Sequence, residues 1–323
     1  MQNQAQPRIV VLDAETLGED VNIAPITDQG DVTVHRNTSA DQTAQRIREA
    51  DIVIANKVLI GPDVLKGSEI RMIAITATGT NNVDLEYCKE NSIGVANVAG
   101  YSTRSVVQQT ASFVLQLVGQ ATYYQGYIAA GSYPRSPIFT HYGPTWFELA
   151  GKRWGIIGLG TIGSGVAAVA EAFGCEIVYH STSGRNIDQP YQQLSLSELL
   201  QSSDVVTVHA PLNEQTRGLI GSDELAQMKS HAVIVNMGRG GIIDEAALAQ
   251  AIVAEQIGGA ATDVYSSEPP AADNPLMKIK ANPSFLATPH TAWASIEART
   301  RLVEEVAENI RAFIEGSERN RVV

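Results

Sequence analysis

The chain has 323 residues, of which 44% are hydrophobic and 18% charged, a composition typical of a soluble globular protein. This length exceeds a usual single core, so we expect two domains. The net charge of −12 argues against a protein that binds nucleic-acid phosphates. No apolar run is long enough to span a bilayer, and Met1–Arg8 is too polar for a secretory signal, so we expect a cytoplasmic protein without a membrane partner.

The first hundred residues alternate apolar strand patterns with helical patterns. Arg8–Leu12, Ile52–Ala55 and Met72–Ile75 are predicted strands, and Ser39–Ala50 is a predicted helix that begins at a Ser or Asp cap. This alternation predicts a small α/β domain.

A long apolar pattern at helical spacing follows, over Thr103–Ala130, and we interpret it as the connector into a second domain. The next segment, Ser132–Pro144, is rich in proline and aromatic residues and is predicted to be an extended arm outside the core. The two cysteines, Cys88 and Cys175, have neither metal-ligand spacing nor a disulfide framework. We therefore expect two core thiols and no metal site.

A glycine-rich turn opens the second domain. Gly158-Leu159-Gly160-Thr161-Ile162-Gly163 follows a predicted strand, Trp154–Ile157, and begins a predicted helix, Ile162–Phe173. In this context the glycines let the backbone approach a pyrophosphate, which the positive end of the helix dipole then attracts. The predicted dinucleotide contacts in this turn are Gly158, Gly160, Thr161, Ile162 and Gly163.

Glu176–Tyr179 is the second predicted strand of this domain, and the loop that follows it indicates which cofactor is bound. A dinucleotide domain usually places an acid here to bind the ribose hydroxyls. This loop has no acid before Asp188 and offers Ser181, Thr182, Ser183 and Arg185. Small hydroxyls and a guanidinium suit a 2′-phosphate, which favours NADP over NAD. The alternative is a polar surface loop with a solvated arginine.

The remaining predicted strands, Val205–His209, Ala232–Asn236, Ala260–Val264 and Phe285–Ala287, are buried and parallel in type. The last three are closed by short polar blocks at residues 235–240, 263–270 and 288–290. Open α/β sheets bind ligands at the carboxyl ends of their strands, so these blocks should place Arg239, Glu268 and His290 on one edge.

These three side chains suit the reduction of a 2-oxo acid. Arg239 lies between two glycines, and its guanidinium could bind a carboxylate and an adjacent carbonyl oxygen together. His290 could supply the proton to the developing alkoxide, and a paired Glu268 would favour the protonated imidazole. The alternatives are a solvated arginine, a structural histidine and a turn residue before Pro269.

The chain resembles the D-isomer-specific 2-hydroxyacid dehydrogenases over nearly its whole length. The resemblance rests on residues 78–84 (Thr-Gly-Thr-Asn-Asn-Val-Asp), the glycine turn, residues 208–212 (Val-His-Ala-Pro-Leu) and the three polar blocks, in this order. It implies two doubly wound parallel-sheet α/β domains, a flavodoxin-like substrate domain (1–102 and 291–323) and a Rossmann NAD(P)-binding domain (103–290). It also implies that a last helix at about Ser295–Glu315 returns to the first domain, and that the long helix and the arm form a homodimer.

The resemblance assigns roles to further residues. Arg239 becomes the substrate clamp, His290 the acid–base and Glu268 its partner, while Asp263 would bind the nicotinamide carboxamide or merely cap a turn. The other implied cofactor contacts are His209, Ala210, Pro211, Thr216, Met237 and Gly238. In the first domain, backbone amides of Thr78 and Gly79 would hold the substrate carboxylate, and Lys57 would face the cleft or remain solvated.

The sequence thus predicts an NAD(P)-dependent reductase that converts a small 2-oxo acid to a D-2-hydroxy acid. Hydroxypyruvate or glyoxylate is the preferred substrate, because residues 288–295 and Asn56-Lys57 resemble the glycerate dehydrogenase branch. Lactate or a branched-chain acid is the alternative within the enzyme class. A dinucleotide-sensing protein like the related corepressors is the alternative outside it, although low-complexity interaction segments are missing. A formate dehydrogenase is disfavoured because that family has an amide at the position of Glu268.

Overall fold

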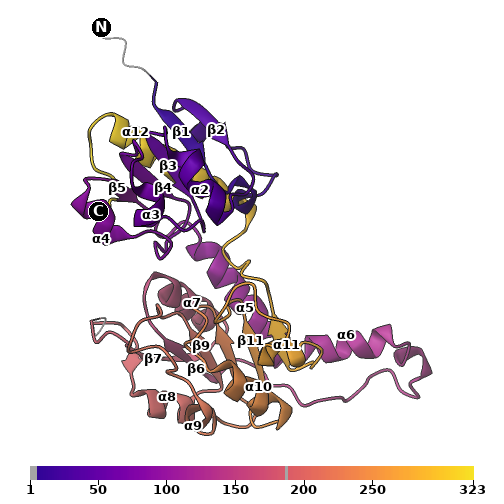
Figure 1. Ribbon diagram of the computed structural model, residues 1–323. Coiled ribbons are helices and arrows are strands. Elements are labelled where there is room, and N and C mark those ends of the chain that lie inside the picture. Colours follow the sequence, from indigo (N-terminus) through magenta and orange to yellow (C-terminus); the bar gives the residue numbers. More distant parts are fainter. Residues whose placement is uncertain (1–5, 186–187) are drawn as a thin grey trace. The chain divides into compact units, whose positions relative to one another are not determined.

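The computed structural model describes residues 6–185 and 188–323, so the first five residues of Met1–Arg8 lie outside the description. The chain forms two compact units, Met1–Ser102 with Ala294–Val323, and Thr103–Trp293 (Figure 1). The sequence analysis placed the second boundary at residue 291, and the structure places it at Ala294. His290 is therefore followed by three more residues of the second unit before the chain returns to the first.

The first unit contains a five-stranded parallel sheet in the order β2-β1-β3-β4-β5, which is the flavodoxin-like order. The apolar runs in β3 and β4 are buried on both faces, as strands covered by helices on both sides must be. The sequence analysis missed two edge strands, because β2 is mostly exposed and β5 has three residues. The strands are β1 (Arg8–Val11), β2 (Asp31–Val34), β3 (Ile52–Ala55), β4 (Met72–Ile75) and β5 (Gly94–Ala96).

The last helix of the chain, α12 (Ile296–Ile314), returns to the first unit, as predicted, and it packs there against β4 and α1. Ser295 caps it by accepting a hydrogen bond from the Ala298 amide. Ser39 caps α2 in a capping box with Gln42. The shorter elements of this unit are η1 (Ala14–Leu17), α1 (Ala24–Thr27), α2 (Ala40–Ile47), α3 (Pro62–Leu65) and α4 (Leu85–Glu90).

The second unit contains a seven-stranded parallel sheet in the order β12-β11-β10-β9-β6-β7-β8. This is the Rossmann order with one strand added beyond the sixth. The predicted strands are present with ends that differ by at most two residues, and only the two-residue β8 was missed. The strands are β6 (Arg153–Ile157), β7 (Glu176–His180), β8 (Gln192–Gln193), β9 (Val205–Val208), β10 (Val233–Asn236), β11 (Gly259–Thr262) and β12 (Phe285–Ala287).

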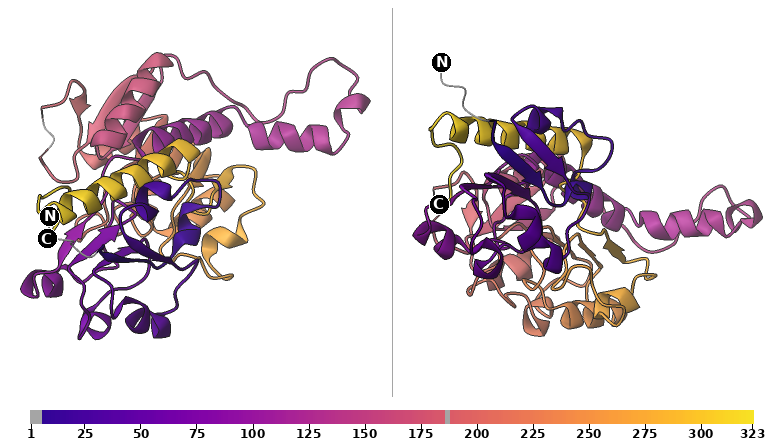
Figure 2. Two further views of the ribbon diagram at one scale, coloured as in Figure 1. Left: turned by 90° about the horizontal axis from the view of Figure 1, so that it is seen from above. Right: turned by 45° about the horizontal axis from the view of Figure 1, so that its top comes forward.

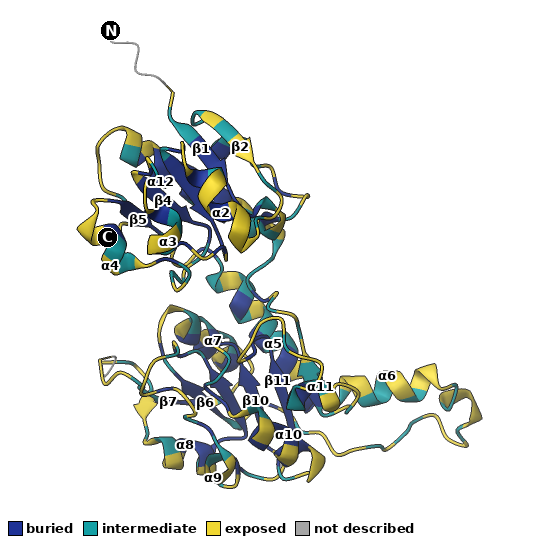
Figure 3. Cartoon of the chain, viewed as in Figure 1, coloured by how far each residue is buried: buried dark blue, intermediate teal, exposed yellow. Residues whose placement is uncertain are grey.

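Two clusters of buried residues form the core of the second unit. Figure 3 shows the strands of its sheet coloured mostly as buried. Trp154 of β6 is fully buried in one of the two core clusters, and its Nε1 donates to Thr207 Oγ1 at 3.0 Å. The helices are α5 (Thr103–Val118), α6 (Ala121–Ala129), η2 (Tyr133–Arg135), α7 (Thr161–Ala172), α8 (Leu196–Ser202), α9 (Ser222–Leu225), α10 (Glu245–Val253) and α11 (Pro275–Lys278).

The predicted single helix over Thr103–Ala130 is wrong. Gly119 and Gln120, the latter with a left-handed φ of 54°, divide it into α5 and α6. α5 packs against α7, β10 and β11 and belongs to the second unit, whereas no residue of α6 is buried. In both views of Figure 2, α6 and the loop after it extend away from the sheet of this unit.

The arm over residues 132–144 lies outside the core, with Phe139 89% and Tyr142 86% exposed. The two cysteines differ: Cys88 is buried, whereas Cys175 is only partly buried and its Sγ donates to the Leu149 carbonyl at 3.3 Å, so the expectation of two core thiols holds for one. No helix in the described part of the chain is long and apolar enough to cross a membrane. Nor do the described residues include a cluster of three or more His, Cys, Asp or Glu that could hold a metal ion.

Candidate active site

The register of the second sheet decides where its functional loops lie. Val208, Asn236, Thr262 and Ala287 end four neighbouring strands, and successive pairs of them are matched across the sheet. The residues that follow therefore leave the sheet at one edge. This edge carries His209, Met237, Asp263 and Thr288, each the first residue after its strand.

The glycine turn after β6 is shaped to admit a ligand. Gly158 has a φ of 92°, and a Cβ there would lie 2.9 Å from the Ala210 nitrogen. A Cβ on Gly163 would lie 2.3 Å from the Gly158 carbonyl oxygen, so both glycines are required by close packing. A Cβ on Gly160 would meet nothing within 4 Å, which leaves open space at the start of α7. A pyrophosphate fits this arrangement, because the first amides of α7, at Thr161 and Ile162, face that end.

The loop after β9 contains buried polar atoms without partners. Neither ring nitrogen of His209 is accessible to solvent or has a hydrogen-bond partner among the described residues. Burial lowers the pKa of His209 to about 3, so its ring is neutral at pH 7. Gly158 packs against the His209 and Ala210 backbone, so the loop that carries His209 lies beside the glycine turn. Such atoms are what a bound polar group would satisfy, and they support a dinucleotide at this edge.

Thr216, another predicted cofactor contact, is bonded within its own loop. It is buried, its Oγ1 donates to the Pro211 carbonyl at 2.6 Å, and the same oxygen accepts from the Asn213 amide at 2.8 Å. Thr216 therefore holds the loop that carries His209, Ala210 and Pro211.

The candidate phosphate loop follows β7, which pairs directly with β6. Ser181 and Thr182 are partly exposed, and Ser183 and Arg185 are exposed. The guanidinium of Arg185 makes no hydrogen bond or ion pair with a described residue, and only the Arg185 amide is engaged, donating to Ser183 Oγ at 3.3 Å. These groups are accessible to an anion.

Arg239 extends from a turn that its neighbours fix. Buried Asn236 donates to the Arg239 carbonyl at 3.0 Å and accepts from the Gly238 amide at 3.1 Å. The Arg239 guanidinium donates only to the Gly238 carbonyl, at 2.8 Å, and no described carboxylate pairs with it. The charge is exposed and remains available to an anionic ligand.

Asp263 holds residues on both sides of His290. Its Oδ1 accepts from Thr288 Oγ1 at 2.5 Å and from the Thr291 amide at 2.8 Å, and its Oδ2 accepts from the Ala292 amide at 3.0 Å. His290 between them has a left-handed φ of 55°, which is uncommon for a non-glycine residue, and these hydrogen bonds support that conformation. Burial raises the pKa of Asp263, whereas these hydrogen bonds favour its charged form.

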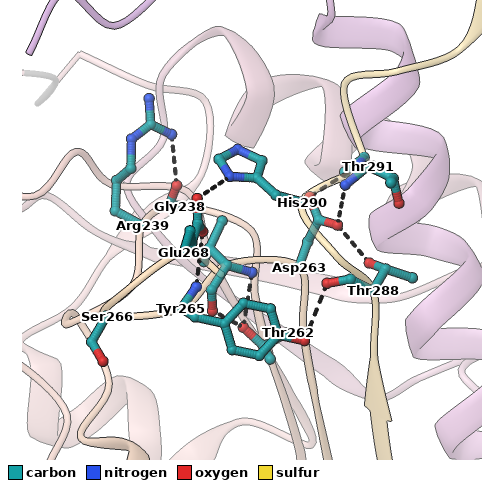
Figure 4. Close-up of polar contacts among 12 residues, drawn as sticks. Gly238, Arg239, Thr262, Asp263, Tyr265, Ser266, Glu268, Thr288, His290 and Thr291 are labelled. Carbon is teal, nitrogen blue, oxygen red and sulfur yellow. Dashed lines mark hydrogen bonds and ion pairs between the residues drawn. The ribbon is translucent and has the colours of Figure 1, made fainter. Parts of the chain in front are cut away.

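Glu268 and His290 form a direct pair, as predicted from the sequence. His290 Nδ1 donates to Glu268 Oε2 at 2.6 Å, and Glu268 Oε1 accepts from the Tyr265 amide at 3.0 Å (Figure 4). The carboxylate fixes Nδ1 as the donor and leaves Nε2 for a ligand. Figure 4 shows the Arg239 guanidinium and the His290 ring on the same side of Glu268. An anion-binding cation and a carboxylate-paired imidazole suit the reduction of a carbonyl beside a carboxylate.

The predicted residues of the first unit lie at the carboxyl ends of β3 and β4. The Lys57 amide donates to Asp13 Oδ2 at 2.8 Å, and its side chain is exposed. Thr78 is held by its own hydroxyl, which donates to the Val98 carbonyl at 2.9 Å, and by Asn97 Nδ2, which donates to the Thr78 carbonyl at 2.6 Å. Gly79 follows in this loop.

Sequence reasoning missed Asp13. Its carboxylate is buried and also accepts from the Asn56 amide at 2.9 and 3.1 Å, so it fixes the Asn56-Lys57 turn. An aspartate directly after the predicted strand Arg8–Leu12, at the carboxyl edge of a parallel sheet, was the signal that could have found it.

Comparison with known proteins agrees with this geometry. Residues 111–292, more than half of the chain, match the model of the D-isomer-specific 2-hydroxyacid dehydrogenase NAD-binding domain. The chain belongs to the D-isomer-specific 2-hydroxyacid dehydrogenase family. It is therefore an oxidoreductase that uses a nicotinamide dinucleotide and acts between a 2-oxo acid and a D-2-hydroxy acid.

Two relatives within this family align along nearly their whole length. The glycerate dehydrogenase of Methylorubrum extorquens is 32% identical over 317 residues, covering 98% of each chain. The hydroxypyruvate reductase of Blautia hydrogenotrophica is 34% identical over 324 residues, covering 98% of this chain and 99% of the relative. Among solved structures, an acyclic imino acid reductase in complex with NADPH and D-arginine has a TM-score of 0.83 at 27% identity, over 98% of this chain and all of that one.

Proposed function

We propose that the chain is a cytoplasmic reductase whose substrate is hydroxypyruvate or glyoxylate. The observation that carries the proposal is the Glu268–His290 pair, with an Arg239 that has no carboxylate partner among the described residues. The names of the two relatives, a glycerate dehydrogenase and a hydroxypyruvate reductase, support this substrate class.

The side chains divide the chemical work. Arg239 binds the substrate carboxylate and carbonyl oxygen and orients the carbonyl carbon. A nicotinamide bound at the glycine turn would supply the hydride. His290, as an imidazolium held by Glu268, gives its Nε2 proton to the oxygen as negative charge develops there. Lys57 and the Thr78–Gly79 loop contribute further substrate contacts in this proposal. Asp263, which holds the His290 loop, would also contact the nicotinamide carboxamide.

A panel of 2-oxo acids tests the substrate. The purified chain is mixed with NADPH or NADH and with hydroxypyruvate, glyoxylate, pyruvate or a branched-chain 2-oxo acid, and nicotinamide absorbance is followed. We expect the highest kcat/KM with hydroxypyruvate or glyoxylate. A higher value with pyruvate or a branched-chain acid would assign the chain to another member of the class. Binding of the dinucleotide without oxidation by any of the acids would favour a sensor protein.

We infer a preference for NADP from the loop after β7. Ser181, Thr182 and Ser183 offer hydroxyls, Arg185 offers a guanidinium that no described carboxylate pairs with, and an acid that would repel a 2′-phosphate is missing from this position. The structurally similar imino acid reductase was solved with NADPH, which agrees with this preference.

We also propose a homodimer formed through α6 and the arm. The arm exposes Phe139 and Tyr142, and Trp146, two residues after the arm, is 56% exposed. The shape of the arm is nevertheless fixed from within: His141 stacks on Tyr127 at 3.8 Å, and Tyr133 donates to the Phe139 carbonyl at 2.7 Å. An ordered segment with large exposed aromatic side chains is typical of an interface, and a second copy offers it a self-complementary partner. Light scattering after size exclusion should give twice the chain mass, and Phe139→Ser combined with Tyr142→Ser should give the monomer mass.

A further inference from the structure

We propose that Glu245 is a positioning residue, which fixes the Glu268 loop so that Glu268 stays paired with His290. The proposal rests on the proposed function of this pair. It concerns a residue at the first position of α10, on a different element from either partner. Glu245 does not contact His290 and would act only through the loop.

The carboxylate of Glu245 binds the loop at both ends. Its Oε1 accepts from the Ser266 amide at 2.6 Å, and its Oε2 accepts from Ser266 Oγ at 2.9 Å and from Asn274 Nδ2 at 2.7 Å. Ser266 lies two residues before Glu268 and Asn274 lies six residues after it. These contacts therefore bracket the segment that carries Glu268.

Two successive amides connect Glu245 to Glu268. The Tyr265 amide donates to Glu268 Oε1, and the next amide, that of Ser266, donates to Glu245. The backbone of Tyr265 joins these two amides, so its position sets where the Glu268 carboxylate lies. Gly240 packs against the same backbone, since a Cβ there would lie 1.9 Å from the Tyr265 carbonyl carbon. Displacement of this backbone would move Glu268 relative to His290.

The loop that carries Glu268 is mostly exposed, so polar contacts and not burial hold it in place. Tyr265 is buried, but Ser266, Ser267, Glu268 and Pro269 are all exposed. Hydrogen bonds to a charged acceptor are stronger than neutral ones, so the three that Glu245 accepts are suited to hold an exposed loop. Glu245 is itself fixed, because Asp244 caps α10 by accepting from the Ala247 amide at 2.8 Å.

The charges near His290 make the position of Glu268 important for the protonation of the His290 ring. Asp263 also acts on His290 through its charge, and the Tyr265 hydroxyl donates to the Thr288 carbonyl beside it. Of the two carboxylates, Glu268 alone is hydrogen-bonded to the ring. A Glu268 that moves away should therefore destabilise the imidazolium while Asp263 stays in place.

The test compares Glu245→Ala and Glu245→Gln with the parent by measuring kcat/KM for 2-oxo acid reduction against pH. We expect the alkaline limb to move to lower pH in Glu245→Ala, with a loss of about tenfold at pH 8 and little loss at pH 6, as a change of one pH unit in the limb implies. Glu245→Gln keeps an acceptor for the Ser266 amide, so its alkaline limb should lie between those of Glu245→Ala and the parent. Glu224→Ala is the matched control, because Glu224 also accepts from a backbone amide in the first turn of a helix, that of Gly221.

A double variant separates positioning from general damage. Glu268→Gln is expected to move the alkaline limb by itself, so adding Glu245→Ala to it should move the limb little further. An equal loss at every pH, a loss matched by Glu224→Ala, or a full additional shift in the double variant would each overturn the proposal. Thermal unfolding of each variant shows whether the fold is retained.

A second measurement does not require activity. NMR signals of the His290 ring are followed against pH in the parent, in Glu245→Ala and in Glu224→Ala. The midpoint should move to lower pH only in Glu245→Ala, and an unchanged midpoint would overturn the positioning role. A parent that reduces no 2-oxo acid would refute the proposed function, while the NMR result would still decide the role of Glu245.

Discussion

His290 Nδ1 lies 2.6 Å from Glu268 Oε2, although 22 residues separate the two in the chain. A carboxylate at this distance stabilises the imidazolium that must give its proton during reduction. Glu268→Gln should therefore move the pH profile of kcat/KM for reduction to lower pH, and His290→Ala should nearly abolish reduction at every pH. Steady-state rates between pH 5 and 9 check both, and a glutamine variant with the parent's profile would disprove the pairing.

Arg239→Lys should impair catalysis more than dinucleotide binding. Lysine keeps the charge but cannot bind a carboxylate and a carbonyl oxygen through one planar fork. We expect kcat/KM for the 2-oxo acid to fall by about a hundredfold or more, with the dinucleotide Kd near that of the parent. Kinetics with a fluorescence titration measure the two effects. Arg311→Lys, an exposed arginine of α12, is the control, and equal losses in catalysis and in dinucleotide binding would indicate a role of Arg239 in the fold instead.

The carboxylate of Asp204 should make stability depend on pH. Burial raises its pKa, but hydrogen bonds from Lys229, the Arg153 amide and His231 outweigh this and lower the pKa to about 2. A pKa below the unfolded value stabilises the fold above about pH 4, and this stabilisation is lost as the pH falls through 2. The side chain of Asp204 is 8% exposed, whereas that of Lys229 is 34% and that of His231 50% exposed, so screening reduces the gain.

Asp204→Asn should accordingly lower the free energy of unfolding by roughly 1–2 kcal/mol at pH 7, and the difference from the parent should shrink between pH 4 and pH 2. Urea unfolding at several pH values measures it. Asp223→Asn, at an exposed position of α9, should show no such dependence. A constant difference at all pH values would mean that the charge of Asp204 is not what stabilises the fold.

Arg185→Ala tests the cofactor preference. If the loop after β7 binds a 2′-phosphate, the variant should lose about 1.5–3 kcal/mol of NADPH binding, roughly ten- to hundredfold in Kd, with little change for NADH. Ser181→Asp should repel the phosphate and turn the preference toward NADH. Salt should weaken NADPH binding more than NADH binding in the parent, because an exposed ion pair is screened. A parent that prefers NADH, or an alanine variant that weakens both cofactors equally, would refute the phosphate pocket.

The sequence by itself determined most strands of the two sheets and the edge on which the site lies. Buried parallel strands are continuous apolar runs, so β3, β4, β9 and β10 could be located closely. Because parallel strands end at one edge, the residues after β10, β11 and β12 also predicted that Arg239, Glu268 and His290 belong together. These features depend on local pattern and on a general rule of topology.

Tertiary structure alone decided what holds those residues in place. Glu245 and Ser266 are 21 residues apart, and Asp13 and Asn56 are 43 apart, and no local pattern pairs them. The break between α5 and α6 was likewise hidden, because the apolar pattern continues across Gln120 while only α5 has a sheet to pack against. A hydrophobic period shows which face of an element can be buried, whereas hydrogen bonds between distant loops depend on where the packed core has already placed them.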